Sequence, residues 1–134
     1  MNIIVENPEK NPDKNVWEKL EEKYGITIMK EIKDFIALNS GGDPKKSMIE
    51  TKDGNHEVRK ILSLNTENKY YSILKYADKF LSDTKGKIIP IAVDSGGNYF
   101  CVNNETGKVY FWFADDGLYY LITDSVEEFC KILS

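Results

Sequence analysis

Cysteine and histidine are the side chains that most often bind transition metals or serve as nucleophile and base, and this sequence has few of them. It contains two cysteines, Cys101 and Cys130, and a single histidine, His56. Isolated cysteines in apolar surroundings are typical of buried free thiols, and three scattered ligands fall short of a zinc set. A catalytic pair of Cys101 with His56 would require the fold to bring the two together. We expect no metal, no cofactor and no catalytic site, and we expect His56, beside an Asp-Gly turn, to lie on the surface.

Two turn segments carry carboxylates that could act on a ligand. The segment Asp94-Ser95-Gly96-Gly97-Asn98 could offer backbone N–H groups to an anion, but the phosphate-binding patterns GxxxxGK[ST] and GxGxxG are absent. Its glycines are better explained as turn residues that adopt a positive φ, with Asp94 kept as a candidate functional carboxylate. The segment Asp115-Asp116-Gly117 lacks the further oxygen ligands of a calcium loop. We expect it to be a solvated turn.

Aromatic residues gather near the C-terminus, in Tyr110-Phe111-Trp112-Phe113 and in Tyr119-Tyr120. Because side chains alternate along a strand, these rings must lie on both faces of a sheet. If helices cover both faces, all six rings belong to the core. If helices cover one face, Tyr110 and Trp112 form an exposed aromatic patch of the kind found at protein interfaces.

Charge is unevenly distributed along the chain. Residues 1–86 hold 15 basic and 15 acidic side chains, whereas residues 87–134 hold three lysines and seven acidic side chains, which is the whole net charge of −4. An acidic surface disfavours nucleic acid and anionic membranes as partners, and base stacking on aromatic rings would need a cationic surround. A basic protein partner would fit, although solubility alone would also explain the asymmetry.

These observations select five residues as a candidate partner-binding site. They combine the aromatic face with the nearby carboxylates, and they are Tyr110, Trp112, Asp115, Asp116 and Asp94.

The first half of the chain reads as helices and one hairpin. Apolar residues recur at helical spacing from Pro12 to Gly25 and again over residues 28–39. Residues 47–64 predict a hairpin, with strands 47–51 and 57–64 around an Asp-Gly turn. A third helix is predicted over residues 67–82, with Tyr70 on its apolar stripe.

The second half reads as a meander followed by a helix. Ile88–Val93 is almost wholly apolar, as a strand buried on both faces would be. Strands at 99–102, Val109–Phe113 and 118–122 follow, separated by turns rich in glycine and aspartate. Ser125 opens a terminal helix with a Ser-x-x-Glu capping box.

This order of elements predicts the fold class α+β, with a largely antiparallel twisted sheet (hairpin plus C-terminal meander) packed with about four helices. Pro90 inside the first meander strand predicts a bulge or an edge position. The 134 residues, with 41% hydrophobic and 30% charged side chains, suit a single domain over 1–134. Residues 1–11 are expected to form an extended arm. The N-terminus lacks an apolar signal region, so we expect a cytoplasmic protein, or one exported by a route that the sequence does not show, and no membrane partner.

The pattern resembles the SUKH superfamily, which includes the Smi/Knr cell-wall-assembly-regulator domain. The resemblance covers nearly the whole chain, and the segment from Asp94 to Cys101 is its most specific part. Its features, in order, are Phe35-Ile36-Ala37-Leu38-Asn39-Ser40-Gly41-Gly42, a middle hairpin, a helix with Tyr71 and Tyr76, Ile88-Ile89-Pro90-Ile91-Ala92-Val93-Asp94-Ser95-Gly96-Gly97-Asn98-Tyr99-Phe100-Cys101, Gly107-Lys108-Val109-Tyr110-Phe111-Trp112, and a terminal helix with Ser125 and Phe129. One departure is Ile28-Met29, where many members open the second helix with Leu-Pro.

The resemblance implies protein binding rather than catalysis. Many bacterial members are immunity proteins that neutralise polymorphic or contact-dependent toxins, and others are regulatory or scaffold modules. We therefore predict an immunity protein that occludes a basic toxin domain by direct binding. The alternatives are a regulatory or scaffold domain of the same fold with a housekeeping partner, and a small ligand-binding or enzymatic domain.

Overall fold

The C-terminal half of the protein folds into a five-stranded antiparallel sheet. The computed structural model describes residues 1–134, and the order of the strands in the sheet is β5-β6-β7-β8-β9. The strands are β5 (Lys60–Ile61), β6 (Ile88–Val93), β7 (Tyr99–Asn103), β8 (Val109–Phe113) and β9 (Leu118–Thr123). The predicted meander and the α+β class are confirmed. Pro90 lies at a bulge, as predicted, because the β6–β7 register shifts between Pro90 and Ala92.

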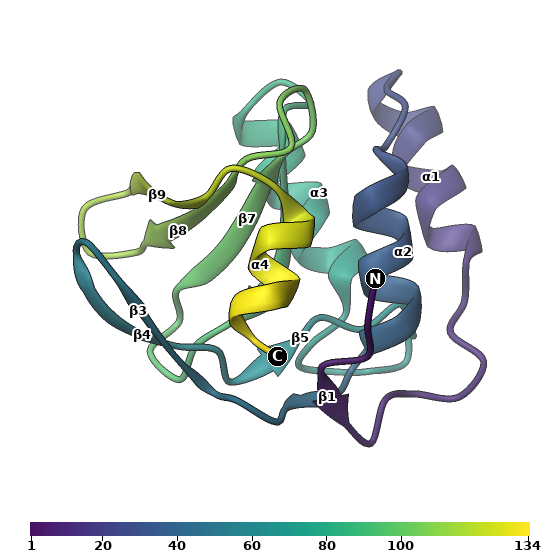
Figure 1. Ribbon diagram of the computed structural model, residues 1–134. Helices are drawn as coiled ribbons and strands as arrows, with labels where there is room; N and C mark the ends of the chain where they lie inside the picture. Colours follow the sequence, from purple (N-terminus) through teal and green to yellow (C-terminus); the bar gives the residue numbers. More distant parts are fainter.

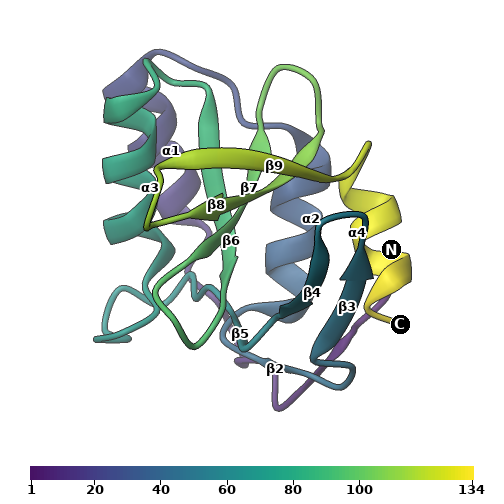
Figure 2. The ribbon, with the colours of Figure 1, turned by 90° about the vertical axis from the view of Figure 1, so that its left-hand side faces the viewer.

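Helices cover both faces of this sheet (Figures 1 and 2). They are α1 (Asn15–Tyr24), α2 (Lys30–Asn39), α3 (Ile73–Asp83) and α4 (Val126–Ile132). On one face, Phe80 of α3 packs edge-on against Trp112 of β8, with ring centroids 5.2 Å apart. On the other, Phe129 of α4 lies 5.6 Å from Phe100 of β7, and α2 packs behind it. A cluster of 29 buried side chains forms the main core.

The third helix begins six residues later than predicted. Residues 67–72 form turns before α3, and Tyr70 is 67% exposed rather than part of an apolar stripe. The reason is local: the side-chain carbonyl of Asn68 accepts the Tyr71 N–H, and Ser63 exchanges backbone hydrogen bonds with Tyr71 and Ile73. These contacts hold residues 67–72 in turns beside Ser63, so the segment does not join the helix.

The middle hairpin is shorter than predicted. It consists of β3 (Met48–Thr51) and β4 (Gly54–Glu57), with Thr51 opposite Gly54, so Lys52 and Asp53 alone form the turn. The predicted second strand, 57–64, divides between two sheets, because Lys60–Ile61 leaves the hairpin and pairs with β6. The hairpin thereby stands apart from the large sheet, beside α4 and below β9 in Figure 2.

Residues 1–11 run extended and are tied to the body of the protein. Strand β1 (Val5–Glu6) pairs with β2 (Asp43–Pro44), and the Glu9 carboxylate accepts hydrogen bonds from the Ser40 and Ser63 hydroxyls at 2.7 and 2.6 Å. The chain passes so close to the Gly-Gly pair that a Cβ on Gly42 would lie 2.4 Å from Val5 Cγ2. The pair therefore leaves room for the arm.

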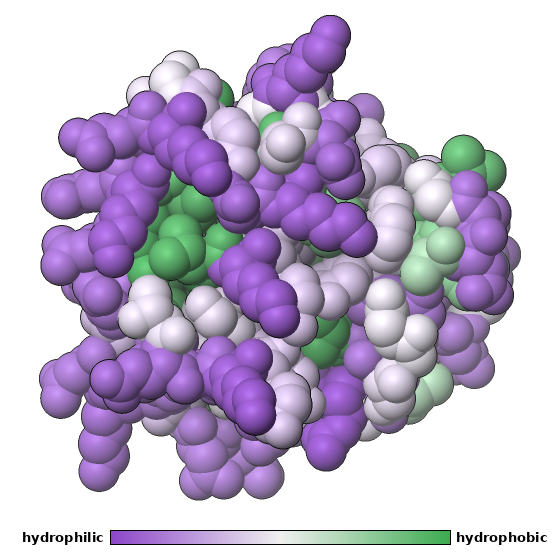
Figure 3. Space-filling model, turned by 180° about the vertical axis from the view of Figure 1, so that it is seen from behind, coloured by the Kyte–Doolittle hydropathy of each residue, from purple (hydrophilic) through white to green (hydrophobic).

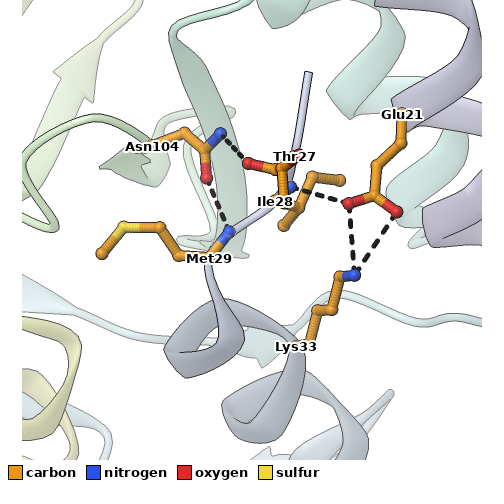
Figure 4. A network of polar contacts seen from close by, with 6 residues as sticks. All are labelled: Glu21, Thr27, Ile28, Met29, Lys33 and Asn104. Carbon is orange, nitrogen blue, oxygen red and sulfur yellow. Dashed lines mark hydrogen bonds and ion pairs between the residues drawn. The ribbon is translucent and has the colours of Figure 1, made fainter. Parts of the chain in front are cut away.

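The first two helices begin two to three residues later than predicted. Helix α1 starts at Asn15 rather than Pro12, after the Asp13 carboxylate has accepted the Asn15 N–H. Helix α2 starts at Lys30 rather than residue 28, because side chains of other elements accept the preceding N–H groups. Figure 4 shows the Asn104 side chain accepting from Met29 N and donating to Thr27 O, at 2.8 and 2.9 Å. The predicted cap of the last helix is confirmed, since Ser125 Oγ accepts from Glu128 N at 3.1 Å.

None of the helices combines the length and apolar character that crossing a bilayer requires.

Candidate protein-binding groove

An open groove lies between the β3–β4 hairpin, the outer end of the sheet and α4. One part, of about 450 Å³, lies between the hairpin and the ends of β6 and β8; a second, of about 1000 Å³, follows β9 toward α4. The two parts share Asp53 and Tyr120, and we call them together the acidic groove. The first part is lined by Asp53, Asn55, His56, Glu57, Asp94, Asn98, Phe111, Phe113, Asp116 and Tyr120. The second is lined by Glu50, Thr51, Lys52, Asp53, Tyr119, Tyr120, Leu121, Ile122, Thr123, Asp124, Glu128, Lys131 and Ile132.

The groove carries the protein's excess negative charge. Its lining includes seven carboxylates and two lysines, a local excess of five negative charges, whereas the whole chain has a net charge of −4. The rest of the molecule is therefore close to neutral. Such a concentration of one sign in a concave surface attracts cationic groups and raises the rate at which they arrive.

Three of these carboxylates, those of Glu50, Asp53 and Asp124, are exposed and form no hydrogen bond or ion pair with the protein. Glu50 and Asp53 come from the hairpin, whereas Asp124 follows β9. Sequence reasoning did not select them. Glu50 and Asp53 are distant from β9 in the sequence, and nothing in the neighbouring residues indicates that the hairpin faces that strand. These three carboxylates are the acidic groups freest to bind a partner.

His56 lies on the floor of the groove instead of at a surface turn, which corrects the sequence prediction. It belongs to β4, is half-buried, and its ring centroid lies 4.3 Å from that of Phe111. Its Nε2 atom is buried without a hydrogen-bond partner. Burial lowers the pKa of His56, against the opposing attraction of Asp53 and Asp94. The imidazole is therefore neutral at pH 7.

Asp94 lines the groove and also holds its own turn together. Its Oδ1 accepts the N–H groups of Gly96 and Asn98 at 2.9 and 2.8 Å, and its Oδ2 accepts from Asn98 Nδ2 at 2.8 Å. The Asn98 side chain in turn accepts the Ala114 N–H, which fixes the end of β8. Gly97 has a φ of +82°, so the segment from Asp94 to Asn98 is a turn. The sequence favoured this interpretation over an anion-binding segment.

Asp116 and Asp115 differ, although they are neighbours in the β8–β9 turn. Asp116 lines the groove, where its carboxylate accepts the Leu118 N–H at 2.8 Å and the Tyr120 hydroxyl. The bond to Asp116 raises the pKa of Tyr120. Asp115 is exposed and does not line the groove. Reversing the charge of Asp116 would therefore disturb the turn, whereas Asp115 can be changed with little structural cost.

Tyr110 and Trp112 lie on the opposite face of the sheet from His56 and Phe111. Both are half-buried. They are therefore neither fully buried in the core nor part of an exposed patch, which were the two possibilities that the sequence left open. Trp112 packs on Phe80, and the Lys79 ammonium lies 5.5 Å from its ring. The structure thus brings Asp94 and Asp116 together in one groove and places the two aromatic candidates elsewhere.

The cysteines are buried free thiols, as predicted. Cys101 pairs across the sheet with Tyr110 and packs near Phe80, on the α3 face, whereas His56 packs on the Phe111 face. The sheet therefore separates the two members of the catalytic pair that the sequence left open. Burial also raises the pKa of the Cys101 thiol, which keeps it protonated.

The surface seen from behind Figure 1 is mostly hydrophilic, with apolar residues confined to small areas between polar ones (Figure 3). Binding surfaces of monomeric proteins usually show a larger continuous apolar patch or a strong local charge. This face therefore shows no large apolar patch that would compete with the acidic groove as a binding surface.

Comparisons with known proteins agree with the resemblance seen in the sequence. The family model of the SMI1/KNR4 family (SUKH-1) matches residues 11–131. The SPbeta prophage-derived uncharacterized protein YokK of Bacillus subtilis (strain 168) is 36% identical in an alignment 66 residues long, which covers 46% of this chain and 34% of YokK. The matched stretch thus spans about a third of that relative's length.

A crystal structure of a protein from Pseudomonas syringae pv. tomato has a similar fold. It superposes with a TM-score of 0.51 at 22% sequence identity, over 84% of this chain and 76% of that one. At this identity the likeness concerns the fold alone.

Proposed function

The chain belongs to the SMI1/KNR4 family (SUKH-1), and from this premise we propose that it is a protein-binding module that neutralises a cognate toxin by direct binding. The observation that carries the proposal is the acidic groove, with five negative charges in excess of its lysines. Its sign suits a basic toxin domain, such as one that itself binds nucleic acid. The mechanism is occlusion: the bound protein covers the toxin's working surface.

Two kinds of group in the groove support protein binding over small-molecule chemistry. The free carboxylates of Glu50, Asp53 and Asp124 can pair with lysine and arginine side chains. The rings of Phe113 and Tyr120 beside them offer flat apolar contact and cation–π partners for the same cations. This surface replaces Tyr110 and Trp112 as the proposed contact region and retains Asp94 and Asp116, whereas Asp115, the exposed neighbour of Asp116 in the same turn, does not line it.

The experiment is co-expression of the protein with the product of the adjacent gene in a bacterial host, followed by a binding measurement on the purified pair. The groove variant carries Glu50→Lys, Asp53→Lys and Asp124→Lys. These side chains hold no internal contacts, so the variant should keep its melting temperature. Loss of electrostatic steering should slow association by about ten-fold or more at low salt, with a weaker salt dependence.

A matched control carries the same charge change away from the groove, as Glu22→Lys, Glu67→Lys and Glu105→Lys, all at exposed positions. If the control slows association as much as the groove variant does, net charge alone drives binding and the groove has no special part. A protein that does not bind or neutralise the neighbouring gene product would instead favour the regulatory or scaffold alternative.

A further inference from the structure

Strand β9 forms the outer edge of the five-stranded sheet. It pairs with β8 on one side, and no strand pairs with it on the other. In Figure 2 it crosses in front of β7 and β8, on the outside of the molecule. The N–H and C=O groups of alternate residues along β9 point away from β8 and are available to a further strand.

Apart from a bulge at Ile122, where the β8–β9 register shifts between Val109 and Tyr110, this edge lacks the features by which proteins usually protect an edge strand. The segment Leu118–Thr123 contains no charged residue, no proline and no glycine. Leu118 and Leu121 are 56% and 47% exposed. Leu118 pairs with Phe113 and Leu121 with Tyr110, so the two leucines project on opposite faces of the sheet. A strand added beside β9 would cover both.

Carboxylates stand at both ends of β9. Asp115 and Asp116 precede it, and Asp124 follows it. If two copies of the chain paired through β9, an antiparallel arrangement would bring Asp116 of one copy toward Asp124 of the other, and a parallel one would bring identical carboxylates together. Like charges oppose both arrangements. Lysine or arginine at the ends of the added strand would instead meet opposite charge at both ends.

We infer that β9 receives an extended segment of the partner protein as a sixth strand, and that this segment has an uncharged centre with basic residues at its ends. This inference deepens the proposed function and rests on it for the identity of the partner as a toxin. The larger part of the acidic groove, about 1000 Å³, follows β9 from Tyr119 to Asp124 and provides room for the side chains of such a segment. Main-chain pairing provides affinity, and the charges at the ends provide register and selectivity.

The first test uses a synthetic peptide of alternating valine and threonine with lysines at both ends. Hydrogen exchange is measured amide by amide on the full chain, with and without the peptide. The β9 amides that point away from β8 should exchange at least about ten-fold more slowly in its presence. A peptide with glutamates at its ends, and one with prolines in its centre, should give no protection. Unchanged exchange in β9, or equal binding of the proline peptide, would overturn the inference.

The second test uses the toxin and the paired variant Leu118→Lys, Leu121→Lys. Both side chains are exposed, so the fold should survive, whereas lysines on the edge should repel a basic segment and weaken binding by about ten-fold or more. The control, Ile3→Lys with Tyr70→Lys, adds the same charge at exposed apolar positions away from β9. If both variants bind the toxin with equal affinity, edge pairing is wrong, even if the toxin is still neutralised.

Sedimentation of the free protein tests the remaining possible occupant of the β9 edge, which is a second copy of the chain. A dimer that forms with concentration and protects the β9 amides would show that a second copy pairs there, against the inference. If the toxin fails to bind while the lysine-ended peptide protects β9, the proposed toxin partner is wrong and the edge still accepts a basic strand.

Discussion

The imidazole of His56 lies against the ring of Phe111, with centroids 4.3 Å apart, and Nε2 is buried without a partner. This contact joins the small hairpin to the large sheet, so it fixes the hairpin side of the acidic groove relative to the sheet. A protonated imidazole would be a partly desolvated charge with a buried N–H donor left unpaired, which is costly. The contact therefore depends on the neutral form of His56.

The first prediction concerns pH. The pKa of His56 is lowered in the folded protein, mainly by burial, from its ordinary 6.5. Below that pH the unfolded chain binds a proton that the folded chain resists, so the free energy of unfolding should fall as pH decreases. This contribution is fully present above about pH 7 and is lost progressively below about 6.5. Denaturant unfolding between about pH 8 and about pH 5 measures it.

The control is His56→Phe, which keeps a ring against Phe111 and removes the titrating group. Its free energy of unfolding should vary less over the same range. Asp78, whose pKa is also lowered by Lys23 and Tyr24, loses its contribution only below its ordinary 3.8 and so does not interfere. Equal slopes for the two proteins would contradict the neutral His56 contact.

The second prediction concerns the two hydrogen bonds of the Asn104 side chain, which fasten the segment between α1 and α2 to the β7–β8 turn. Asn104→Ala leaves the Met29 N–H and the Thr27 carbonyl without these partners, so it should lower the free energy of unfolding by about 1–3 kcal/mol. Asn104→Asp keeps the acceptor for Met29 but loses the donor to Thr27, and should cost less. Urea unfolding of the three proteins tests this order, and an alanine variant as stable as the parent would contradict it.

The meander, the bulge at Pro90 and the Ser125 cap could be predicted from the sequence because each depends on neighbouring residues. Turn glycines, alternation and a capping serine act within a few positions of themselves. The predicted helix starts were less accurate, because side chains far away in the sequence determine where a helix begins. Asn104, for example, accepts the Met29 N–H, although 75 positions separate the two residues.

The candidate site was half predicted, for the same reason. Asp94 and Asp116 were selected because their turns are visible in the sequence, and the structure places both in the groove. The remaining lining depends on where the hairpin folds, and nothing near Asp53 or His56 indicates that it will face the ends of β8 and β9. Alternation did predict that Phe111 and Trp112 lie on opposite faces, but it could not say which face α3 would cover.

The third prediction separates stability from binding at Trp112. Its ring packs edge-on against Phe80 and is half-buried, so Trp112→Ala should lower the free energy of unfolding by about 2–4 kcal/mol, somewhat less than for a fully buried tryptophan. Because Trp112 does not line the groove and packs against Phe80 of α3, partner affinity of the folded variant should stay within about two-fold. Thermal melting together with a binding measurement checks both. Wild-type stability with a large loss of affinity would restore Trp112 as an interface anchor.

The fourth prediction concerns the Gly-Gly pair and the N-terminal arm. A Cβ at Gly42 would lie 2.4 Å from Val5 Cγ2 and 2.6 Å from Val5 Cβ, closer than side chains approach. Val5 is buried and paired with Pro44, so it cannot move without disturbing the β1–β2 contact. Gly42→Ala should therefore lower the free energy of unfolding by about 1–3 kcal/mol.

The double variant tests whether this cost comes from the clash with Val5. Val5→Ala alone should destabilise the protein by removing buried methyl groups, by about 1–2 kcal/mol. In the Gly42→Ala background the same change removes Val5 Cγ2, the nearer of the two clashing atoms, and leaves Val5 Cβ, so it should cost less than in the parent protein without restoring full stability. Denaturant unfolding of the four proteins gives the coupling free energy between the two positions. Strictly additive costs would mean that the arm does not pack against Gly42, and the glycine pair would then need another explanation, such as the positive φ of +66° at Gly41.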